Sequence, residues 1–423
     1  MTLSSRGQQN ADQLSIPWRF ALPPTYSPHT NPTGLISFAT AENVLVQPEL
    51  HAFASRVSVP KEAFRYASNH GGGARLSSAF AAHINEFFNP YWHVQAGDVK
   101  TTAGATGVHD IFAFSLCGEG EGVLTSRPYY GRFEIDFGNK AGVRLLAADT
   151  DHEDCFDEGV VEAFERALVE SRKEGVEVRA LLVINPHNPL GRCYPRETLV
   201  ALMRFCQKHG LHFISDEIYA LSVFDNPEAA EAASFTSALS IDPTDVIDPY
   251  FVHVIYGLSK DFGAAGLKLG CLVSRNKNLK NAAQAVQRFS GVSGLSVAVA
   301  TAMLEDRVWC HEFIATSRRR LGEAYRFATG RLKEIGVEVF EGTNAAFFVW
   351  MNLNPWLPPE RTRLGGDTRE QMLAQKLVNN GVFLQPGEEH GREGWFRLVF
   401  SLDKGLVEEG LRRIEKTLKE VSW

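Results

Sequence analysis

The feature that most constrains this chain is an alternation of apolar runs and helical patterns in its middle third. Residues 158–173 place apolar side chains at helical spacing, and residues 178–184 form an apolar run of strand length. Residues 198–209 again fit a helix, for which Gly210 is the expected C-cap, and residues 211–214 form a second short apolar run. Strands that alternate with helices in this way predict a parallel sheet covered by helices on both faces.

Polar residues follow each of these two apolar runs. Residues 185–189, with the sequence Asn-Pro-His-Asn-Pro, come after the first run, and Asp216 follows the second. Ligands of open parallel sheets bind outside the carboxyl ends of the strands. We therefore expect Asn188 and Asp216 to lie at one site.

A different pattern begins near residue 300, where a long helical segment precedes short apolar runs. Residues 308–333 fit one helix, and the strand candidates are 337–340, 345–351 and 395–400. A helix followed by strands is typical of a smaller α+β domain, and 423 residues exceed what one small core needs. The expected parts are an N-terminal arm joining the small domain (1–50), a large domain (51–300) and a small domain (301–423).

Composition excludes several classes of function. A net charge of −7 lacks the basic balance that a nucleic-acid partner would need. The first fifteen residues are polar, and the most apolar long segment, 292–304, is too short to span a bilayer. The six cysteines are scattered without metal-ligand spacing. We therefore expect a cytoplasmic protein with no membrane partner and no metal site.

Several residues could carry chemistry, and each alone has a structural alternative. The small-residue loop 103–107 opens a helix and could bind an anion, although most such loops are only tight turns. Tyr130 offers an aromatic face, but paired tyrosines more often pack. A single aspartate such as Asp216 is usually a helix cap. A lysine in a loop, such as Lys260, is usually a solvated surface charge.

Taken together, these groups could bind pyridoxal 5′-phosphate (PLP). The prediction of this cofactor rests on the presence of all of them, not on any single residue. An anion-binding loop suits its phosphate, and an acid keeps its pyridine nitrogen protonated, so that the ring withdraws electrons from a carbanion at the substrate Cα. A phenol, Tyr219, follows the acid. Lys260 would hold the aldehyde as a Schiff base and, once displaced by substrate, remove the Cα proton.

Four sequence blocks carry a resemblance to a known family: NPHNPLG (185–191), SDEIY (215–219), SKDFGAAG (259–266) and GWFR (394–397). The chain resembles fold-type I PLP enzymes of the class I/II aminotransferase family, from about residue 31 to residue 400. It is most similar to the 1-aminocyclopropane-1-carboxylate (ACC) synthase-like branch. Residues 31–34 and 41–43 of this chain resemble the N-terminal signature of that branch. The resemblance implies an α/β fold-type I transferase fold with a large, mostly parallel sheet and a smaller α+β domain. It also implies a small amino-acid substrate and a homodimer with shared active sites.

The resemblance further implies a role for each matched residue. Lys260 would form the internal aldimine, Asp216 would pair with the pyridine nitrogen, and Tyr219 would bond the ring's phenolic oxygen; these three are the expected catalytic residues. The planar fork of Arg397 suits the substrate α-carboxylate. The expected cofactor-binding set is Ala105, Thr106, Tyr130, Asn188, Asp216, Tyr219, Ser259, Lys260 and Lys268, and the expected substrate-binding set is Arg397, Glu42 and Asn69.

Three positions depart from the family pattern, all at the phosphate end. Gly257 and Lys268 stand where serine and arginine are usual, and Asn69 stands where a tyrosine reaches the partner subunit's phosphate, with Tyr66 as an alternative. A lost neutral hydrogen bond costs about 0.5–1.5 kcal/mol and a charged one roughly 1.5–3 kcal/mol. The departures therefore predict a weaker phosphate anchor. A further hypothesis is that they free volume for a larger substrate.

The residues determine the cofactor more closely than the reaction. The Ala41-Glu42-Asn43 signature favours a PLP-dependent lyase, acting by ACC synthase-like β- or γ-elimination through a Lys260 Schiff base and a quinonoid carbanion, with carbon–sulfur lyase as one form. An aminotransferase that exchanges the amino group with a 2-oxo acid is the alternative. A catalytically degenerate binding protein of the same fold is the third hypothesis.

Overall fold

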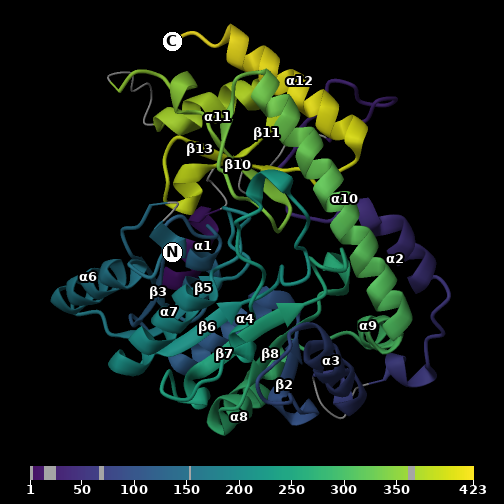
Figure 1. Cartoon of the computed structure of the whole chain (residues 1–423), viewed down its shortest axis with the longest axis vertical. Helices are drawn as coiled ribbons and strands as arrows, with labels where there is room; N and C mark the ends of the chain where they lie inside the picture. Colours follow the sequence, from purple (N-terminus) through teal and green to yellow (C-terminus); the bar gives the residue numbers. More distant parts are fainter. Residues whose placement is uncertain (1–2, 14–24, 66–70, 152–153, 361–366) are drawn as a thin grey trace.

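The predicted alternation of strands and helices forms a seven-stranded sheet in the larger, lower part of the molecule (Figure 1). The computed structural model describes residues 3–13, 25–65, 71–151, 154–360 and 367–423. The strand order is β2-β8-β7-β6-β5-β3-β4, and β8 alone in this sheet runs antiparallel to its neighbours. The sheet is therefore mostly parallel, as predicted. Its strands are β2 (Val99–Thr102), β3 (Gly122–Thr125), β4 (Arg144–Ala147), β5 (Val178–Ile184), β6 (His212–Asp216), β7 (Val252–Gly257) and β8 (Gly270–Ser274).

Helices cover the sheet and form much of the second part of the molecule. In chain order they are α1 (Ser5–Asp12), α2 (Gln47–Ala54), α3 (Gly73–Phe87), α4 (Gly104–Leu116), α5 (Phe133–Gly138), α6 (Val160–Lys173), α7 (Arg196–His209), α8 (Lys277–Val286), α9 (Gly294–Glu305), α10 (Arg307–Glu334), α11 (Arg369–Asn379) and α12 (Lys404–Glu420). Gly210 ends α7 with φ 65°, a left-handed conformation that glycine adopts readily, so the predicted C-cap is confirmed. Within the described ranges, no helix is at once long and apolar enough to cross a membrane.

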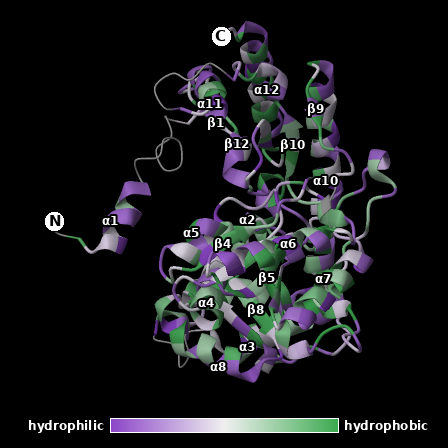
Figure 2. Ribbon diagram, turned by 90° about the vertical axis from the view of Figure 1, so that its left-hand side faces the viewer, coloured by the Kyte–Doolittle hydropathy of each residue, from purple (hydrophilic) through white to green (hydrophobic). Residues whose placement is uncertain are grey.

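Alternate residues of the central strands point into two apolar cores. In β5, Leu181 and Val183 pack into the core that includes residues of α7 and α10, whereas Ala180 and Leu182 pack into the core that includes residues of α4 and α8. Figure 2 shows mainly hydrophobic strands at the centre and hydrophilic residues on the surrounding helices. Burial on both faces explains why the strand appears in the sequence as an apolar run without alternation.

The second part of the molecule is built on a four-stranded antiparallel sheet with the order β12-β13-β10-β9. Its strands are β9 (Glu338–Val339), β10 (Phe348–Asn352), β12 (Gln385–Pro386) and β13 (Trp395–Val399). The long helix α10 runs from the large sheet up to this part, where it lies beside α12 (Figure 1). Strand β1 (Ile36–Ser37) pairs in parallel with β11 (Val382–Phe383), which attaches the N-terminal segment to the C-terminal part. The expected boundaries at residues 50 and 300 stay predictions.

Candidate active site

A cavity of about 340 Å³ lies at the carboxyl ends of β5, β6 and β7. Strands β5 and β6 pair with Ile184 opposite Asp216, which brings the loop after β5 next to the end of β6. Of the residues singled out in the sequence, the cavity is lined by Ala105, Thr106, Tyr130, Asn188, Asp216, Tyr219, Ser259, Lys260, Lys268 and Arg397. Segments that are far apart in the sequence therefore meet at one edge of the sheet.

One end of the cavity carries unpaired hydrogen-bond donors. Helix α4 begins there, and its N-cap residue Ala103 supplies no side-chain bond to the first-turn N–H groups. No acidic residue stands in that first turn. The Lys268 side chain lines the same cavity and makes no hydrogen bond or ion pair with another described residue. A helix N-terminus with a nearby ammonium group is suited to a phosphate.

Lys260 follows the end of β7 by three residues and lines the cavity. Its Nζ donates a hydrogen bond to the carbonyl oxygen of Ala41 at 2.6 Å and lies 5.8 Å from the centre of the Tyr219 ring. Burial and, to a smaller extent, the nearby Arg397 lower the pKa of Lys260 to about 8, against the opposing effects of Glu42 and Asp216. An amine with this pKa is partly unprotonated near neutral pH, as a nucleophile or base must be.

Asp216 is held by a buried histidine that sequence reasoning missed. His109 Nε2 lies 3.2 Å from Asp216 Oδ2, and His109 Nδ1 lies 2.9 Å from Asp136 Oδ2. Burial by itself lowers the pKa of His109, but the hydrogen bonds with the two carboxylates outweigh burial and raise the pKa to about 9. The imidazole is therefore a cation at neutral pH, and its contact with Asp216 Oδ2 fixes the position of that carboxyl group in the cavity.

Arg397 is buried on β13, and its guanidinium is already aligned. Its Nη1 donates to Asn188 Oδ1 at 2.8 Å, and its Nη2 donates to the carbonyl oxygen of Ala39 at 2.6 Å. Its Nε is buried with no hydrogen-bond partner among the described residues. Burial lowers the pKa of Arg397, while Tyr219 and Tyr130 act in the opposite direction. A guanidinium that lines a cavity and keeps an unused donor is suited to a carboxylate ligand.

The two tyrosines of the cavity remain protonated phenols. Burial raises the pKa of Tyr130 to about 12 and raises the pKa of Tyr219 still more. The Tyr219 ring is held edge-on by Phe347 and Phe348, with ring centres 5.3 and 5.5 Å away. Tyr219 is therefore a positioned hydroxyl donor rather than a flexible surface group.

The remaining expected residues differ in how the structure places them. Glu42 is exposed and does not line the cavity, although its charge acts on the pKa of Lys260. Asn69 and its alternative Tyr66 lie outside the described residues. The hypothesis that Gly257 frees volume for substrate is wrong for this position. A Cβ at Gly257 would lie 2.7 Å from the carbonyl oxygen of Leu269, so the space is already filled.

The cavity residues that were not found from the sequence include the polar or charged side chains of Thr40, His109, Arg132, Asp136, Gln385 and Glu389. One signal was available for His109, which lies three residues after Thr106 and therefore on the same face of α4, one turn further along. No comparable local signal identifies Asp136, Gln385 or Glu389, which reach the cavity through α5 and the C-terminal part.

The described residues fit PLP along the length of the cavity. The uncapped start of α4 and the unpaired Lys268 suit a phosphate, and the Asp216–His109 pair suits a protonated ring nitrogen. Gly104, with φ 78°, has open space where a Cβ would stand, which leaves the loop open to a ligand. The amine of Lys260 lies in the same cavity.

Comparisons with known proteins agree with this chemistry. The family model "Aminotransferase class I and II" matches residues 60–414. The "Probable aminotransferase aclI" of Aspergillus oryzae is 33% identical over 426 residues, which cover 98% of each chain. The "1-aminocyclopropane-1-carboxylate synthase-like protein 1" of Homo sapiens is 30% identical over 430 residues, which cover 98% of this chain and 83% of that protein. A Thermus thermophilus aspartate aminotransferase mutant superposes with a TM-score of 0.77 at 20% identity, covering 99% and 100% of the two chains, and shares the fold.

Proposed function

The chain belongs to the class I and II aminotransferase family of PLP-dependent enzymes, and we propose that it is a lyase. Its substrate would be an amino acid with a leaving group at Cβ or Cγ, and the reaction we favour is cleavage of a carbon–sulfur bond. The observation that carries the proposal is that Glu42 directly follows Ala41, whose carbonyl oxygen accepts the hydrogen bond from Lys260 Nζ at 2.6 Å, although the Glu42 side chain is exposed and does not line the cavity in this structure. Elimination needs a proton for the departing group as well as a base at Cα, and an acid near the lysine can supply it.

We assign the residues that hold the cofactor from their positions in the cavity. Lys260 would bond to the PLP aldehyde, Asp216 would pair with the ring nitrogen, and the Tyr219 hydroxyl and the Asn188 amide would donate to the ring oxygen. The phosphate would take the N–H groups of Ala105 and Thr106 together with Lys268. Bound in this way, PLP supplies an electron-withdrawing ring that stabilises negative charge at the substrate Cα.

The chain's own side chains perform the remaining work. Arg397 would bind the α-carboxylate and so fix the direction of the Cα–H bond, with Asn188 holding the guanidinium in place. Released from the cofactor, the Lys260 amine would accept the Cα proton at its Nζ, and its lowered pKa keeps it available near neutral pH. His109 would hold the Asp216 carboxyl group in position beside the ring nitrogen.

Transamination is the second candidate, and the 33% identity to a probable aminotransferase of equal length supports it. The two reactions differ in their products. Acting on an S-substituted cysteine, a lyase consumes one water and releases one thiol, one pyruvate and one ammonium ion, without any acceptor. An aminotransferase releases no thiol and depends on an added 2-oxo acid.

The test is to incubate the holoenzyme with S-substituted cysteines and homocysteines and to measure thiol, 2-oxo acid and ammonium together. We expect the three products in equal amounts in the absence of an acceptor. Turnover that requires a 2-oxo acid and yields a new amino acid would replace the lyase by the aminotransferase. A matched E42Q variant should slow thiol release more than it slows exchange of the Cα proton with solvent.

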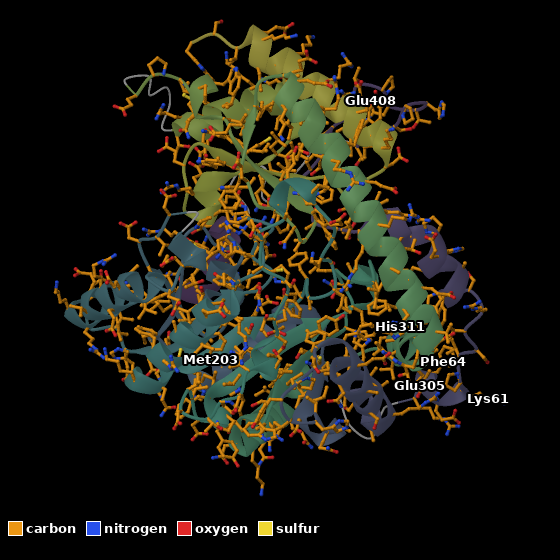
Figure 3. All side chains as sticks on the ribbon, viewed as in Figure 1. Lys61, Phe64, Met203, Glu305, His311 and Glu408 are labelled. Carbon is orange, nitrogen blue, oxygen red and sulfur yellow. The ribbon has the colours of Figure 1, made fainter. Side chains whose placement is uncertain are left out.

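We also infer a homodimer, as the family resemblance implies. Phe64 and Phe289 are 74% and 78% exposed, and Leu295 of α9 is exposed as well. Figure 3 shows Phe64 with Lys61 at the edge of the molecule on the side of α9 and α10. Exposed apolar groups gathered on one side favour an interface. Light scattering should give twice the chain mass, and F289D should lower it; an active monomer at all concentrations would remove this inference.

A further inference from the structure

Glu389 is the one acidic side chain among the described cavity residues that lacks a cationic partner. Asp216 and Asp136 are both hydrogen-bonded to the His109 cation. The Glu389 carboxylate instead accepts a single hydrogen bond, from Gln385 Nε2 to its Oε2 at 3.1 Å. Glu389 is half-buried and lines the cavity, and no described lysine, arginine or histidine forms an ion pair with it. A carboxylate can only accept hydrogen bonds, so Glu389 Oε1 is able to accept one from a donor on a ligand.

Gln385 adds a second acceptor directly beside the residue expected to bind the α-carboxylate. Gln385 lies opposite Arg397 in the antiparallel pairing of β12 with β13, so their side chains are neighbours on one face of the sheet. The bond to Glu389 uses the amide nitrogen and thereby fixes the amide oxygen in the other direction. That oxygen is buried and has no partner among the described residues, and the Gln385 side chain lines the cavity.

The turn that carries Glu389 is held firmly in place. His390 is bonded to Tyr129 twice, through its carbonyl oxygen to the Tyr129 N–H at 3.0 Å and through its Nδ1 to the Tyr129 carbonyl oxygen at 2.7 Å. The backbone of Glu389 packs so closely on Gly131 that a Cβ at Gly131 would overlap with the Glu389 carbonyl oxygen. Glu389 is therefore positioned relative to Tyr130 by backbone contacts on both sides, as a preorganised binding group is.

The charges of the cavity divide into three zones. Lys268 lies at the phosphate end with the start of α4, and Arg397 carries the unused donor suited to a carboxylate. Glu389 supplies negative charge on the Arg397 side of the cavity, where it opposes the lowering of the Arg397 pKa by burial. Arg132 also lines the cavity and is the group that an anionic substrate side chain would use instead.

We propose that Glu389, oriented by Gln385, binds the side chain of the substrate and selects amino acids whose side chain carries a hydrogen-bond donor, best a cation. The proposal rests on the proposed function only in that the substrate's α-carboxylate occupies Arg397. A cationic side chain gains a charge-assisted bond to Glu389, a neutral apolar one gains nothing there, and an acidic one meets like charge.

The test uses holoenzyme and two matched sets of ligands. The first set is L-ornithine, L-norvaline and L-glutamate, and the second is L-lysine, L-norleucine and L-2-aminoadipate. Each set has one chain length and a cationic, a neutral or an anionic end. Binding is measured as the change in the visible absorption of the bound cofactor. We expect the cationic member of at least one set to bind ~10-fold more tightly than the neutral one, and the anionic member to bind least, as for a charge-assisted hydrogen bond.

The variant E389Q should reduce this preference to about twofold, because the amide keeps the shape but removes the charge. The matched control is E388Q, since Glu388 is bonded to Thr368 and Gln371 and does not line the cavity. E388Q should keep the wild-type preference, and equal melting temperatures show that both variants fold. Preference for the acidic ligands, or an unchanged preference in E389Q, would overturn the proposal. If no amino acid alters the absorption, the proposed chemistry at Cα fails as well.

Discussion

The substitution Gly257→Ser tests why this chain lacks the serine that is usual in the family. Gly257 ends β7 and pairs with Gly270 of β8. A Cβ at residue 257 would lie 2.7 Å from the carbonyl oxygen of Leu269 and 3.0 Å from the Cα of Gly270. Both atoms belong to backbone that the β-ladder holds, so no side-chain rotation can relieve the overlap. The structure therefore explains the glycine as a packing requirement of the sheet.

The size of the effect follows from that contact. Forcing extra atoms into a closely packed site costs about 1–3 kcal/mol, and we expect the free energy of unfolding of G257S to fall by this amount. We expect no gain in PLP affinity, because Gly257 does not line the cavity. The matched control is G266S, since a Cβ at Gly266 meets no atom within 4 Å.

Urea denaturation of the cofactor-free enzyme measures the loss, and titration with PLP measures the affinity. G266S should unfold at the wild-type midpoint, whereas G257S should unfold at a lower urea concentration with an unchanged slope. A G257S protein that is as stable as G266S and binds PLP more tightly would refute the packing argument. It would show that the strands can separate and that the missing hydroxyl is a lost phosphate contact.

Three further changes probe the cavity. R397K should lower kcat/KM by about 10- to 100-fold in steady-state kinetics, mostly by raising KM. Lysine keeps the positive charge but cannot form the bidentate bond to a carboxylate. Unchanged kinetics would mean that the α-carboxylate binds elsewhere. K268R should lower the PLP dissociation constant in equilibrium dialysis by roughly threefold to tenfold, since the guanidinium fits a phosphate better; a weaker complex would place Lys268 away from the phosphate. The pKa of His109 is raised from 6.5 to about 9, so its charge stabilises the fold fully below about pH 6.5, and this stability is lost as the pH rises through about 9. At about 1.4 kcal/mol per pKa unit, the His109 charge contributes about 3 kcal/mol to the free energy of unfolding. The urea midpoints of wild type and H109N should therefore converge as the pH rises from about 6.5 to about 9. Midpoints that stay equally far apart over this pH range would contradict the stabilising role of the His109 charge.

Local sequence patterns predicted the strands and helices that place the cavity. β5 was recognisable because both of its faces are buried, which makes it an apolar run, and α7 because Gly210 supplies the left-handed cap. Asn188 and Asp216 could be placed together because parallel strands end at the same edge of a sheet. These inferences need only the spacing of residues within one segment and the rule for parallel sheets.

Contacts between segments that are distant in the sequence could not be predicted from local sequence patterns. Asp136 becomes a partner of His109 only when α5 packs near α4, and Gln385 reaches Arg397 only through the register of β12 with β13. The filled space at Gly257 depends on how closely β8 approaches β7. Each is a long-range distance that no local pattern encodes, and for this reason the sequence hypothesis of freed volume was wrong at Gly257.

The most direct measurement of the central claim identifies the lysine that holds the cofactor. Borohydride reduction of the holoenzyme makes the bond between a lysine amine and the PLP aldehyde carbon permanent, and peptide mass spectrometry then locates the label. The proposed site predicts a single labelled residue, Lys260, together with loss of label and of visible absorption in K260A, while K268A stays labelled. A label on Lys268 or elsewhere, or no label on wild-type protein supplied with PLP, would contradict the proposed site.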